Sequence, residues 1–555
     1  MEKLEKQIQN TINDLYNIAD APVEFSAAPA DVVGDYATNA ALRLAKAVGK
    51  PPRTIAEEII TATDTDYELS IAGAGFINVA IPAKSLMQTL DSEWSETYGQ
   101  NSDGAGKRAI VEFPSPNMAK PYSVGHLRPG NQGWAVKQLL EATGWEVITD
   151  NHLGDYGTPF GIWATGFARS GKSLETITVY ELGAIYIEMK KLLKEDNEAL
   201  KLEVQDWLLR LEKKDPTAVQ LSEHFNKISL KHIHEVMTRL GISTDYELGE
   251  SFFVDQGKEL VEEYLQKGIF TKNDDDSVIC PLDDQGIEVP ILVLKSNGAA
   301  LYATTDLATM VYRANELHPG KIVYAVGAEQ KFYFEQLFAM GRKLNLPQEN
   351  IHLWFGTIDQ LVDGKREKMS SRKGVVLMEE LLDKAEATAL EITEGREVPQ
   401  EDIKKIAVGA IKFTDFLADR KTGILFDWSK IFALTGFSGP FCQYAAVRMN
   451  KIIAQNANHT SVDFSSYDYE AEKDLIKLIL EYPATLRLAA DKLEAHRIAA
   501  YTFRLAQEFN RYYESTPVTQ SADLEKSARL DLLKKLSQIF THSLNLLGIE
   551  IPSRM

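Results

Sequence analysis

Residues 115–133 read SPNMAKPYSVGHLRPGNQG and connect an apolar strand pattern at 109–113 to a helical pattern at about 124–142. The first N–H groups of a helix have no partners within it and carry the positive end of the helix dipole, so such a junction favours an anion. Gly125 lets a ligand approach the backbone, and His126 adds a side-chain donor. The stretch therefore predicts the phosphate-binding end of a nucleotide-binding α/β fold.

Each residue of this stretch also has a purely structural interpretation. Glycine and proline are common in any connection between a strand and a helix. A single histidine beside a glycine is more often structural than catalytic. A turn alone, however, does not need so many polar side chains in one short connection. Those side chains are Ser115, Asn117, Lys120, Ser123 and His126.

A second segment, residues 365–374, reads KREKMSSRKG and follows an apolar strand pattern at 351–358. Five of the nine residues from Lys365 to Lys373 are basic and one is acidic. Most runs of charge are solvated surface. Here two serines and a glycine are interleaved with the cations, as in segments that clamp phosphate. The segment predicts a mobile cationic loop at the end of a second strand.

Together the two segments resemble the paired HIGH and KMSKS elements of class I aminoacyl-tRNA synthetases, with SVGH at 123–126 and KMSSR at 368–372. The flanking residues narrow the resemblance. SPNMAKPYSVGHLR, NHLGDYGTPFG at 151–161 and KMSSRKG are similar to arginyl-tRNA synthetases rather than to their relatives.

The resemblance covers nearly the whole chain. Two segments are similar to the N-terminal domain of that family, two to its amino-acid pocket and two to the start of its anticodon-binding domain. In that order they are GDYATNAAL (34–42), AGAGFINVAI (72–81), ALYATTDLATMVYR (300–313), YAVGAEQKFYF (324–334), FTDFLADRKTGILFDW (413–428) and GFSGPFCQYAAVRM (436–449).

The composition is that of an ordinary globular protein of about three domains, with 555 residues, 44% hydrophobic and 25% charged. Its two cysteines, Cys280 and Cys442, are too few for a disulfide framework or a thiolate zinc site, so we expect no zinc and a cytoplasmic location. No apolar run is long enough to span a bilayer, which gives no support to a membrane role.

The net charge of −20 argues against general affinity for nucleic acids, DNA included, because phosphate neutralisation supplies most non-specific binding. A tRNA-binding protein of this charge must use local basic patches. The candidates are residues 365–373, Arg420 with Lys421, and Arg448 with Lys451. The resemblance implies a monomer.

Hydrophobic periodicity and the resemblance predict an α/β protein with flanking domains. The expected parts are an N-terminal tRNA-binding α+β domain (1–105), a Rossmann-type catalytic domain with a doubly wound parallel sheet (106–375), a linking stem (376–415) and an all-α anticodon-binding helical bundle (416–555). In the catalytic domain we expect strands at 108–113, 145–150, 321–326 and 351–357, and a helical insertion at about 165–250.

Amino-acid activation needs a carboxylate to attack the α-phosphorus of ATP in line, so the site must position two anions and absorb the charge that develops. No side-chain nucleophile is required. We expect His126, Ser123, Lys120 and Lys368 to stabilise the phosphates. The predicted ATP-binding residues are Gly125, His126, Met369, Ser370, Ser371 and Arg372, with Mg²⁺ bound together with ATP.

Recognition of arginine demands acceptors, because a guanidinium has donors only. Asp306 and Tyr302, four residues apart and so on one face of a helical turn, match the family positions that hold the guanidinium. Without the resemblance, Asp306 would be read as a helix cap or a surface acid. The resemblance also implies that Glu112, Ser115, Asn117 and Gln330 line the pocket and hold the ammonium and carboxylate groups of arginine.

Unpaired bases of RNA are held by aromatic stacking and hydrogen bonds. Phe76 and Asn78 are therefore the candidates for contacts with the D-loop of tRNA, and Gln443, Tyr444 and Arg448 for contacts with the anticodon. Aromatic residues at core spacing are the structural alternative for Phe76 and Tyr444.

The sequence departs from the family pattern at three positions. Ser123 replaces the first histidine of HIGH, Tyr333 replaces the histidine usual in QxxHF, and Pro159 stands where GTQFG has glutamine. The departures sustain two alternatives: a catalytically impaired paralogue that binds tRNA, and a different class I synthetase or small nucleotidyltransferase.

We expect an arginine–tRNA ligase that forms arginyl-adenylate from L-arginine and ATP and transfers arginine to the terminal adenosine of its tRNA. Family resemblance implies that the 2′-hydroxyl accepts the arginyl group and that activation depends on bound tRNA.

Overall fold

The computed structural model describes every residue except 1, 20, 29–33, 196–197, 363–364 and 370–375. The chain divides into two compact units. The first comprises Met1–Tyr98, Gln455–Glu481 and Glu508–Leu536, and the second comprises Gly99–Ala454, Tyr482–Gln507 and Ser537–Met555. The C-terminal helices therefore contribute residues to both units.

The N-terminal part is an α+β fold, as predicted. Its antiparallel sheet has the strand order β1-β2-β4-β3. Leu4, Ile8 and Ile12 are fully buried, since their spacing of four places them on one face of the first helix. The elements are α1 (Glu2–Tyr16), β1 (Ser26–Ala27), β2 (Tyr36–Thr38), α2 (Ala40–Val48), α3 (Pro52–Ala62), β3 (Glu68–Ala72), β4 (Phe76–Ala80) and α4 (Ala83–Glu93).

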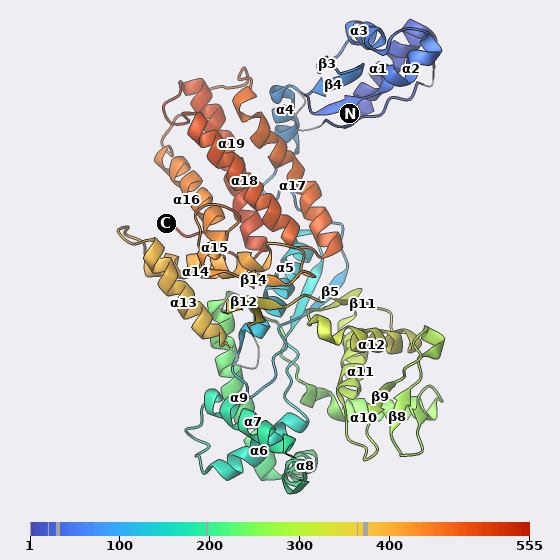
Figure 1. The fold of residues 1–555 in the computed structure, drawn as a ribbon, viewed down its shortest axis with the longest axis vertical. Coiled ribbons are helices and arrows are strands. Elements are labelled where there is room, and N and C mark those ends of the chain that lie inside the picture. Colours follow the sequence, from blue (N-terminus) through green and yellow to red (C-terminus); the bar gives the residue numbers. More distant parts are fainter. Residues whose placement is uncertain (1, 20, 29–33, 196–197, 363–364, 370–375) are drawn as a thin grey trace. The chain divides into compact units, whose positions relative to one another are not determined.

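The central sheet of the second unit is parallel throughout and has the strand order β11-β10-β5-β6 (Figure 1). The first strand, β5, lies inside the sheet, and later strands are added on both sides of it. Ligands bind at the carboxyl ends of the strands where the order reverses, which here is between β5 and β10. The strands are β5 (Arg108–Glu112), β6 (Glu146–Asp150), β10 (Lys321–Tyr324) and β11 (Glu349–His352).

Both faces of this sheet are covered, which explains why its strands are apolar runs. Ala109, Val111 and Val323 belong to one buried cluster, which includes Val136 and Leu140 of α5 (Leu127–Ala142). Ile110 and Ile322, which point to the opposite face, belong to another, with residues of α11 (Tyr302–Tyr312) and α12 (Lys331–Lys343). The doubly wound architecture is thus confirmed.

A long insertion separates β6 from β10. Its helices are α6 (Thr158–Ser170), α7 (Val179–Lys194), α8 (Glu198–Glu212), α9 (Pro216–Arg239) and α10 (Glu250–Gln266). It also contains an antiparallel sheet that the sequence did not predict, with strands β7 (Thr271–Lys272), β8 (Val278–Cys280) and β9 (Ile291–Leu294). Strands of two to four residues are too short for an alternating pattern to reveal them.

The basic segment begins as a strand rather than as a loop. β13 (Lys365–Lys368) pairs antiparallel with β12 (Ile358–Val362), which pairs parallel with β14 (Ile424–Phe426). Charged side chains are compatible with β13 because it is an edge strand of this sheet. The strand expected at 351–357 is β11, which begins earlier, at Glu349, and already ends at His352.

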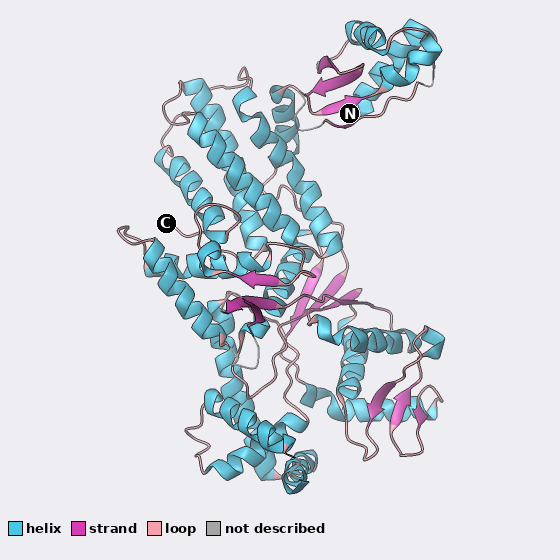
Figure 2. Ribbon diagram, in the orientation of Figure 1, coloured by secondary structure: helices cyan, strands magenta, loops and turns pink. Residues whose placement is uncertain are grey.

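The C-terminal region is predominantly helical, as expected, with β14 its one strand among the residues described there (Figure 2). Its helices are α13 (Met378–Ile392), α14 (Gln400–Asp415), α15 (Trp428–Ile431), α16 (Gly439–Gln455), α17 (Lys473–Lys492), α18 (His496–Ser515) and α19 (Asp523–Leu546).

Candidate active site

A buried ion-pair network lies at the carboxyl ends of the central strands. Glu112 ends β5 and is in register with Asp150 of β6. Arg313 directly follows α11. Its guanidinium pairs with both carboxylates, at 2.7 Å from Glu112 and 2.6 Å from Asp150. All three side chains are at least nine-tenths buried. The carboxylate of Glu112, which we predicted to contact arginine, is thus already paired with an arginine of the chain itself.

The SVGH segment forms the short helix η1 (Val124–His126), which leads directly into α5. The backbone N–H of Ser123 donates to His126 Nδ1 at 3.1 Å. Because Nδ1 accepts this hydrogen bond, the proton of the neutral ring lies on Nε2. Burial lowers the pKa of His126 to about 4, so the ring is neutral near pH 7. His126 is therefore a neutral Nε2–H donor.

The two predicted phosphate-binding segments meet in one cavity. It has a volume of about 180 Å³ and contains Gly125 from the first segment and Lys368 and Met369 from the second. The other lining residues are Val124, Arg128, Glu329, Phe355, Gly356, Thr357 and Ile358. Residues that are more than two hundred positions apart in the sequence thus line the same small cavity, which we call the nucleotide cavity.

The chain returns to the SVGH segment after the basic strand. The Val124 N–H donates to the Val376 carbonyl at 3.0 Å, and Ser123 forms an isolated bridge with Leu377. Lys368 on one side and Val376 on the other therefore both lie beside η1. The predicted ATP-binding residues Ser370, Ser371 and Arg372 lie outside the described residues.

Lys120 lies near the histidine but takes a different direction. Its Nζ is 4.5 Å from the centroid of the Tyr186 ring, in a cation–π contact with α7. Its charge contributes to the lowered pKa of His126 after the larger effect of burial. The Ser123 hydroxyl is 3.4 Å from His126 Nδ1, so this serine contacts the histidine, and its predicted role at the phosphates stays a prediction.

A second cavity, of about 500 Å³, lies between α6, α7, α10 and α11. Tyr302 and Thr305 line it from α11, and Pro159 lines it from the first turn of α6, where the missing N–H of a proline is tolerated. We call it the tyrosine cavity. Its other lining residues are Tyr156, Gly157, Thr158, Ile162, Tyr186, Lys190, Leu193, Lys194, Glu250, Lys295, Ala300 and Leu301.

Asp306 lies one turn after Tyr302, as the sequence predicted. Its Oδ2 accepts a hydrogen bond from the Tyr333 hydroxyl, and its Oδ1 is 3.9 Å from His152 Nε2. Burial raises the pKa of Asp306, and the neighbouring Glu112 adds to this effect. An acidic group in this environment is stabilised as a carboxylate by a nearby cation.

Glu250 was not among the site residues predicted from the sequence. It is the first residue of α10, is buried, and has its pKa raised to about 9 by burial and then by the charges of Asp306 and Asp155. In sequence it reads as an ordinary acid in the first turn of a helix. Only the fold brings this second carboxyl to Asp306 and to the cavity that Tyr302 lines. The pair provides acceptors for a cationic ligand.

The connection after β5 leaves polar groups unsatisfied among the described residues. The Ser115 N–H donates to Asn151 Oδ1 at 3.2 Å, whereas its buried hydroxyl has no partner. The two ring nitrogens of buried His152, which follows β6, also form no hydrogen bond, although Nε2 lies 3.9 Å from Asp306 Oδ1. Asn117 packs against Gly154 so closely that a Cβ there would lie 2.7 Å from Asn117 Oδ1. Buried groups without partners are costly unless a ligand or water satisfies them.

Gln330 ends the short helix η4 (Ala328–Gln330) and is exposed. Neither the nucleotide cavity nor the tyrosine cavity includes it. Its role in the arginine pocket stays a prediction.

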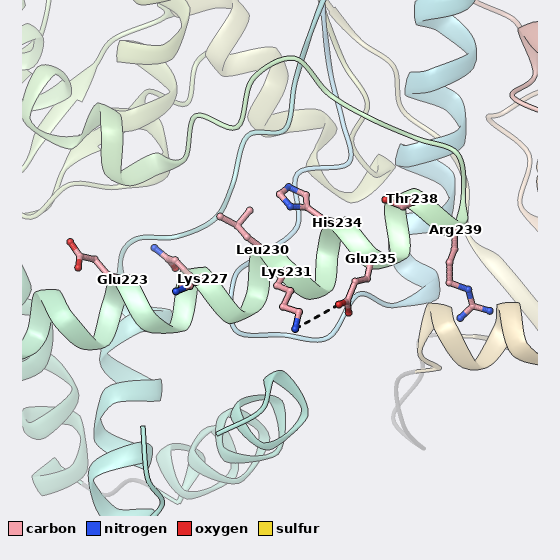
Figure 3. Close-up of a pocket in the computed structure, with 9 residues that line it drawn as sticks. Glu223, Lys227, Leu230, Lys231, His234, Glu235, Thr238 and Arg239 are labelled. Carbon is pink, nitrogen blue, oxygen red and sulfur yellow. Dashed lines mark ion pairs between the residues drawn. The ribbon is translucent and has the colours of Figure 1, made fainter. Parts of the chain in front are cut away.

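A larger hollow of about 1030 Å³ lies along one face of α9 and contains none of the predicted site residues (Figure 3). Its side chains include both acids and bases, and Lys231 pairs with Glu235 at 4.0 Å. Size alone therefore does not identify the functional site. The lining residues are Glu223, Asn226, Lys227, Leu230, Lys231, His234, Glu235, Thr238 and Arg239.

The predicted tRNA-binding residues differ in exposure. Phe76, at the start of β4, is 42% exposed, whereas Asn78 is buried in the same strand. Tyr444 and Arg448 of α16 are partly exposed. Gln443 is buried, and its Nε2 donates to the carbonyls of Lys405 at 2.9 Å and Glu550 at 2.8 Å. Gln443 thus anchors the C-terminal segment in the structure.

Comparison with known families assigns nearly the whole chain. The family described as tRNA synthetases class I (R), catalytic domain, matches residues 89–428, which is more than half of the chain. The chain belongs to the arginyl-tRNA synthetase family. The arginyl tRNA synthetase N terminal domain matches residues 2–81, and the DALR anticodon binding domain matches residues 442–555.

Full-length relatives agree with this assignment. An arginine–tRNA ligase of Clostridium botulinum is 33% identical over 95% of both chains, and one of Lactococcus lactis is 33% identical over 93% of both. Among solved structures, an arginyl-tRNA synthetase of Thermus thermophilus has a TM-score of 0.76 at 21% identity, covering 100% of both chains. That of Plasmodium falciparum has a TM-score of 0.72 at 21% identity and covers 100% of this chain and 99% of its own. The structural likenesses concern the fold.

The described residues contain no group of three or more His, Cys, Asp or Glu side chains arranged to hold a metal ion. Nor do they contain a helix that is both long and apolar enough to cross a membrane.

Proposed function

We propose that the protein is an arginine–tRNA ligase, which activates L-arginine with ATP and transfers it to the terminal adenosine of its tRNA. One observation carries the proposal beyond family membership. The nucleotide cavity is lined by residues that follow β5, β10 and β11. The partly buried Asp306 and buried Glu250 lie near Glu112 and Leu153, so both parts are at the carboxyl ends of the central strands, where a doubly wound sheet binds its ligands. The arrangement offers donors for phosphate on one side and acceptors for a guanidinium on the other.

Each group has a definite task in this reaction. His126, next to Gly125 of the nucleotide cavity, donates from Nε2 to a phosphate oxygen, and Lys368, which lines that cavity, supplies a positive charge. Ser370, Ser371 and Arg372 complete the phosphate contacts by family resemblance. The Mg²⁺ that accompanies ATP binds its phosphate oxygens, and the proposal includes no zinc.

Arginine is held at the other end of the site. Asp306 and Glu250 accept from the guanidinium, and Tyr302 flanks it from the same helix as Asp306. Ser115 and Asn117 lie on the connection that leads to His126, where they are suited to the ammonium and carboxylate groups. The carboxylate of arginine thereby faces the phosphates that it must attack.

We propose that exposed side chains outside the two cavities contact tRNA. Phe76 stacks on a D-loop base, and Tyr444 and Arg448 contact the anticodon loop, because these three retain exposed surface. We further propose transfer to the 2′-hydroxyl, activation that depends on bound tRNA, a monomeric enzyme and a cytoplasmic location.

Aminoacylation of total tRNA, tested with each amino acid separately, decides the function. The expected result is charging by arginine alone. Charging by another amino acid would refute the specificity, and tRNA binding without charging would favour the impaired paralogue.

A further inference from the structure

Tyr333 occupies a position where the family pattern has histidine, and its side chain reaches the predicted arginine site. It lies in the first turn of α12, and its hydroxyl donates to Asp306 Oδ2. The ring is fixed by an edge contact with Phe334, with centroids 5.7 Å apart. The phenol has one proton, and that proton is directed at the carboxylate.

We propose that Tyr333 is a positioning residue for arginine recognition, which fixes the Asp306 carboxylate through Oδ2 and leaves Oδ1 to accept from the guanidinium. The inference rests on the proposed function and deepens it. A guanidinium is a planar fork, so its contact with a carboxylate depends strongly on orientation. A lysine ammonium is a compact charge and depends on it less.

The surroundings of Asp306 explain why a fixed donor is needed. Its neighbours are His152 after β6, Glu112 of β5, Arg313 after α11, Glu250 of α10, Tyr302 of α11, and Tyr324 of β10. Burial raises the pKa of Asp306, and the charge of Glu112 also opposes its ionisation. The hydrogen bond from Tyr333 lowers the pKa again and favours the carboxylate.

The phenol can act as a donor throughout the useful pH range. Burial and the charge of Asp306 raise the pKa of Tyr333 well above its usual value, so the hydroxyl keeps its proton. A histidine at this position also carries an N–H donor. Tyrosine in place of histidine thus preserves a hydrogen-bond donor. It places the donor at a different distance from the backbone, and it removes the imidazole ring, which can become positively charged.

The test compares Tyr333→Phe, Tyr333→His and wild type in steady-state aminoacylation with the full-length enzyme and its tRNA. Phenylalanine keeps the ring and removes only the hydroxyl. Loss of one hydrogen bond to a charged group should raise KM for arginine by about 10- to 100-fold, with KM for ATP changed by less than about threefold. Tyr333→His should recover part of this loss. Phe332→Leu, at the exposed neighbour, is the matched control and should behave as wild type.

A pH profile separates positioning from general packing. Arginine binding needs ionised Asp306, so the contribution of Asp306 to the affinity is fully present above its pKa and is lost as the pH falls through it. Because Tyr333→Phe removes a hydrogen bond that lowers this pKa, the acid limb of kcat/KM for arginine should move to higher pH.

Two results would overturn the inference while leaving the proposed function intact. One is an unchanged KM for arginine in Tyr333→Phe, and the other is an equal rise in the KM values for arginine and ATP with a lowered Tm. If wild-type enzyme itself fails to charge arginine, the proposed function falls and the inference falls with it.

Discussion

The two halves of the site are built in different ways. The nucleotide half uses a helix N-terminus and a few side chains close in sequence, Ser123 to Arg128, joined by Lys368 and Met369. The amino-acid half takes single side chains from several separate elements, among them Glu250, Asp306 and Tyr333. Backbone geometry suffices for phosphate, whereas recognition of a guanidinium requires carboxyl groups that meet only after folding.

The largest effect is expected in the amino-acid half. Asp306→Asn replaces the carboxylate that is proposed to pair with the guanidinium. The guanidinium of bound arginine then has no negative charge at this position. We expect kcat/KM for arginine to fall by about 10²- to 10⁴-fold, while tRNA binding is unchanged. Steady-state aminoacylation and a filter-binding assay measure the two quantities.

Asp276→Asn, in the exposed turn between β7 and β8, is the control for Asp306→Asn. Normal turnover of arginine by Asp306→Asn would refute the role given to this carboxylate.

In the nucleotide half, His126→Ala removes one preorganised donor to the phosphates. We expect kcat to fall by about 10²- to 10³-fold with little change in KM for arginine. Lys272→Ala removes an exposed cation of β7 that belongs to none of the predicted sites and does not line the nucleotide cavity, so it serves as the control. If His126→Ala instead raised only the KM for arginine and left kcat unchanged, His126 would belong to the amino-acid half. The division of the site into two halves would then be refuted.

A smaller effect is expected at Glu250. Its pKa of about 9 means that it is mostly protonated in the free enzyme, and a bound guanidinium should draw off this proton. Glu250→Gln imitates the protonated form but cannot ionise, so arginine affinity should fall by about 10-fold. Calorimetry in buffers of different ionisation enthalpy should show proton release in wild type and less of it in the variant.

The smallest effect is a difference between the halves in pH dependence. The pKa of His126 is lowered to about 4, so its neutral form persists and KM for ATP should stay within about twofold between about pH 6 and pH 8. Glu250 has a raised pKa, so its charged form increases as the pH rises towards 9. KM for arginine should therefore fall with rising pH over the same range. A KM for ATP that rises in parallel with falling pH would contradict the neutral His126.

Sequence reasoning identified the elements that repeat a clear period. The β5–α5–β6 unit, the helical insertion and the C-terminal helices were all predicted, because their apolar positions follow periods of two or about 3.6 residues. It did not predict the β7–β8–β9 sheet or the strand β13, because these strands have only two to four residues, and β13 is made of charged residues as well. The bounds of the four predicted domains stay predictions, although the three matching families follow the predicted order.

The sequence by itself determined the local structure of the proposed phosphate-binding connection, since Gly125, His126 and the helix start that carries them are adjacent in the chain. It also placed Tyr302 and Asp306 on one helical turn. Only the tertiary structure decided which groups surround Asp306. Hydrogen bonds and charges act over a few ångströms, and Tyr333 and Glu250 reach that distance from separate helices through the packing of the whole domain.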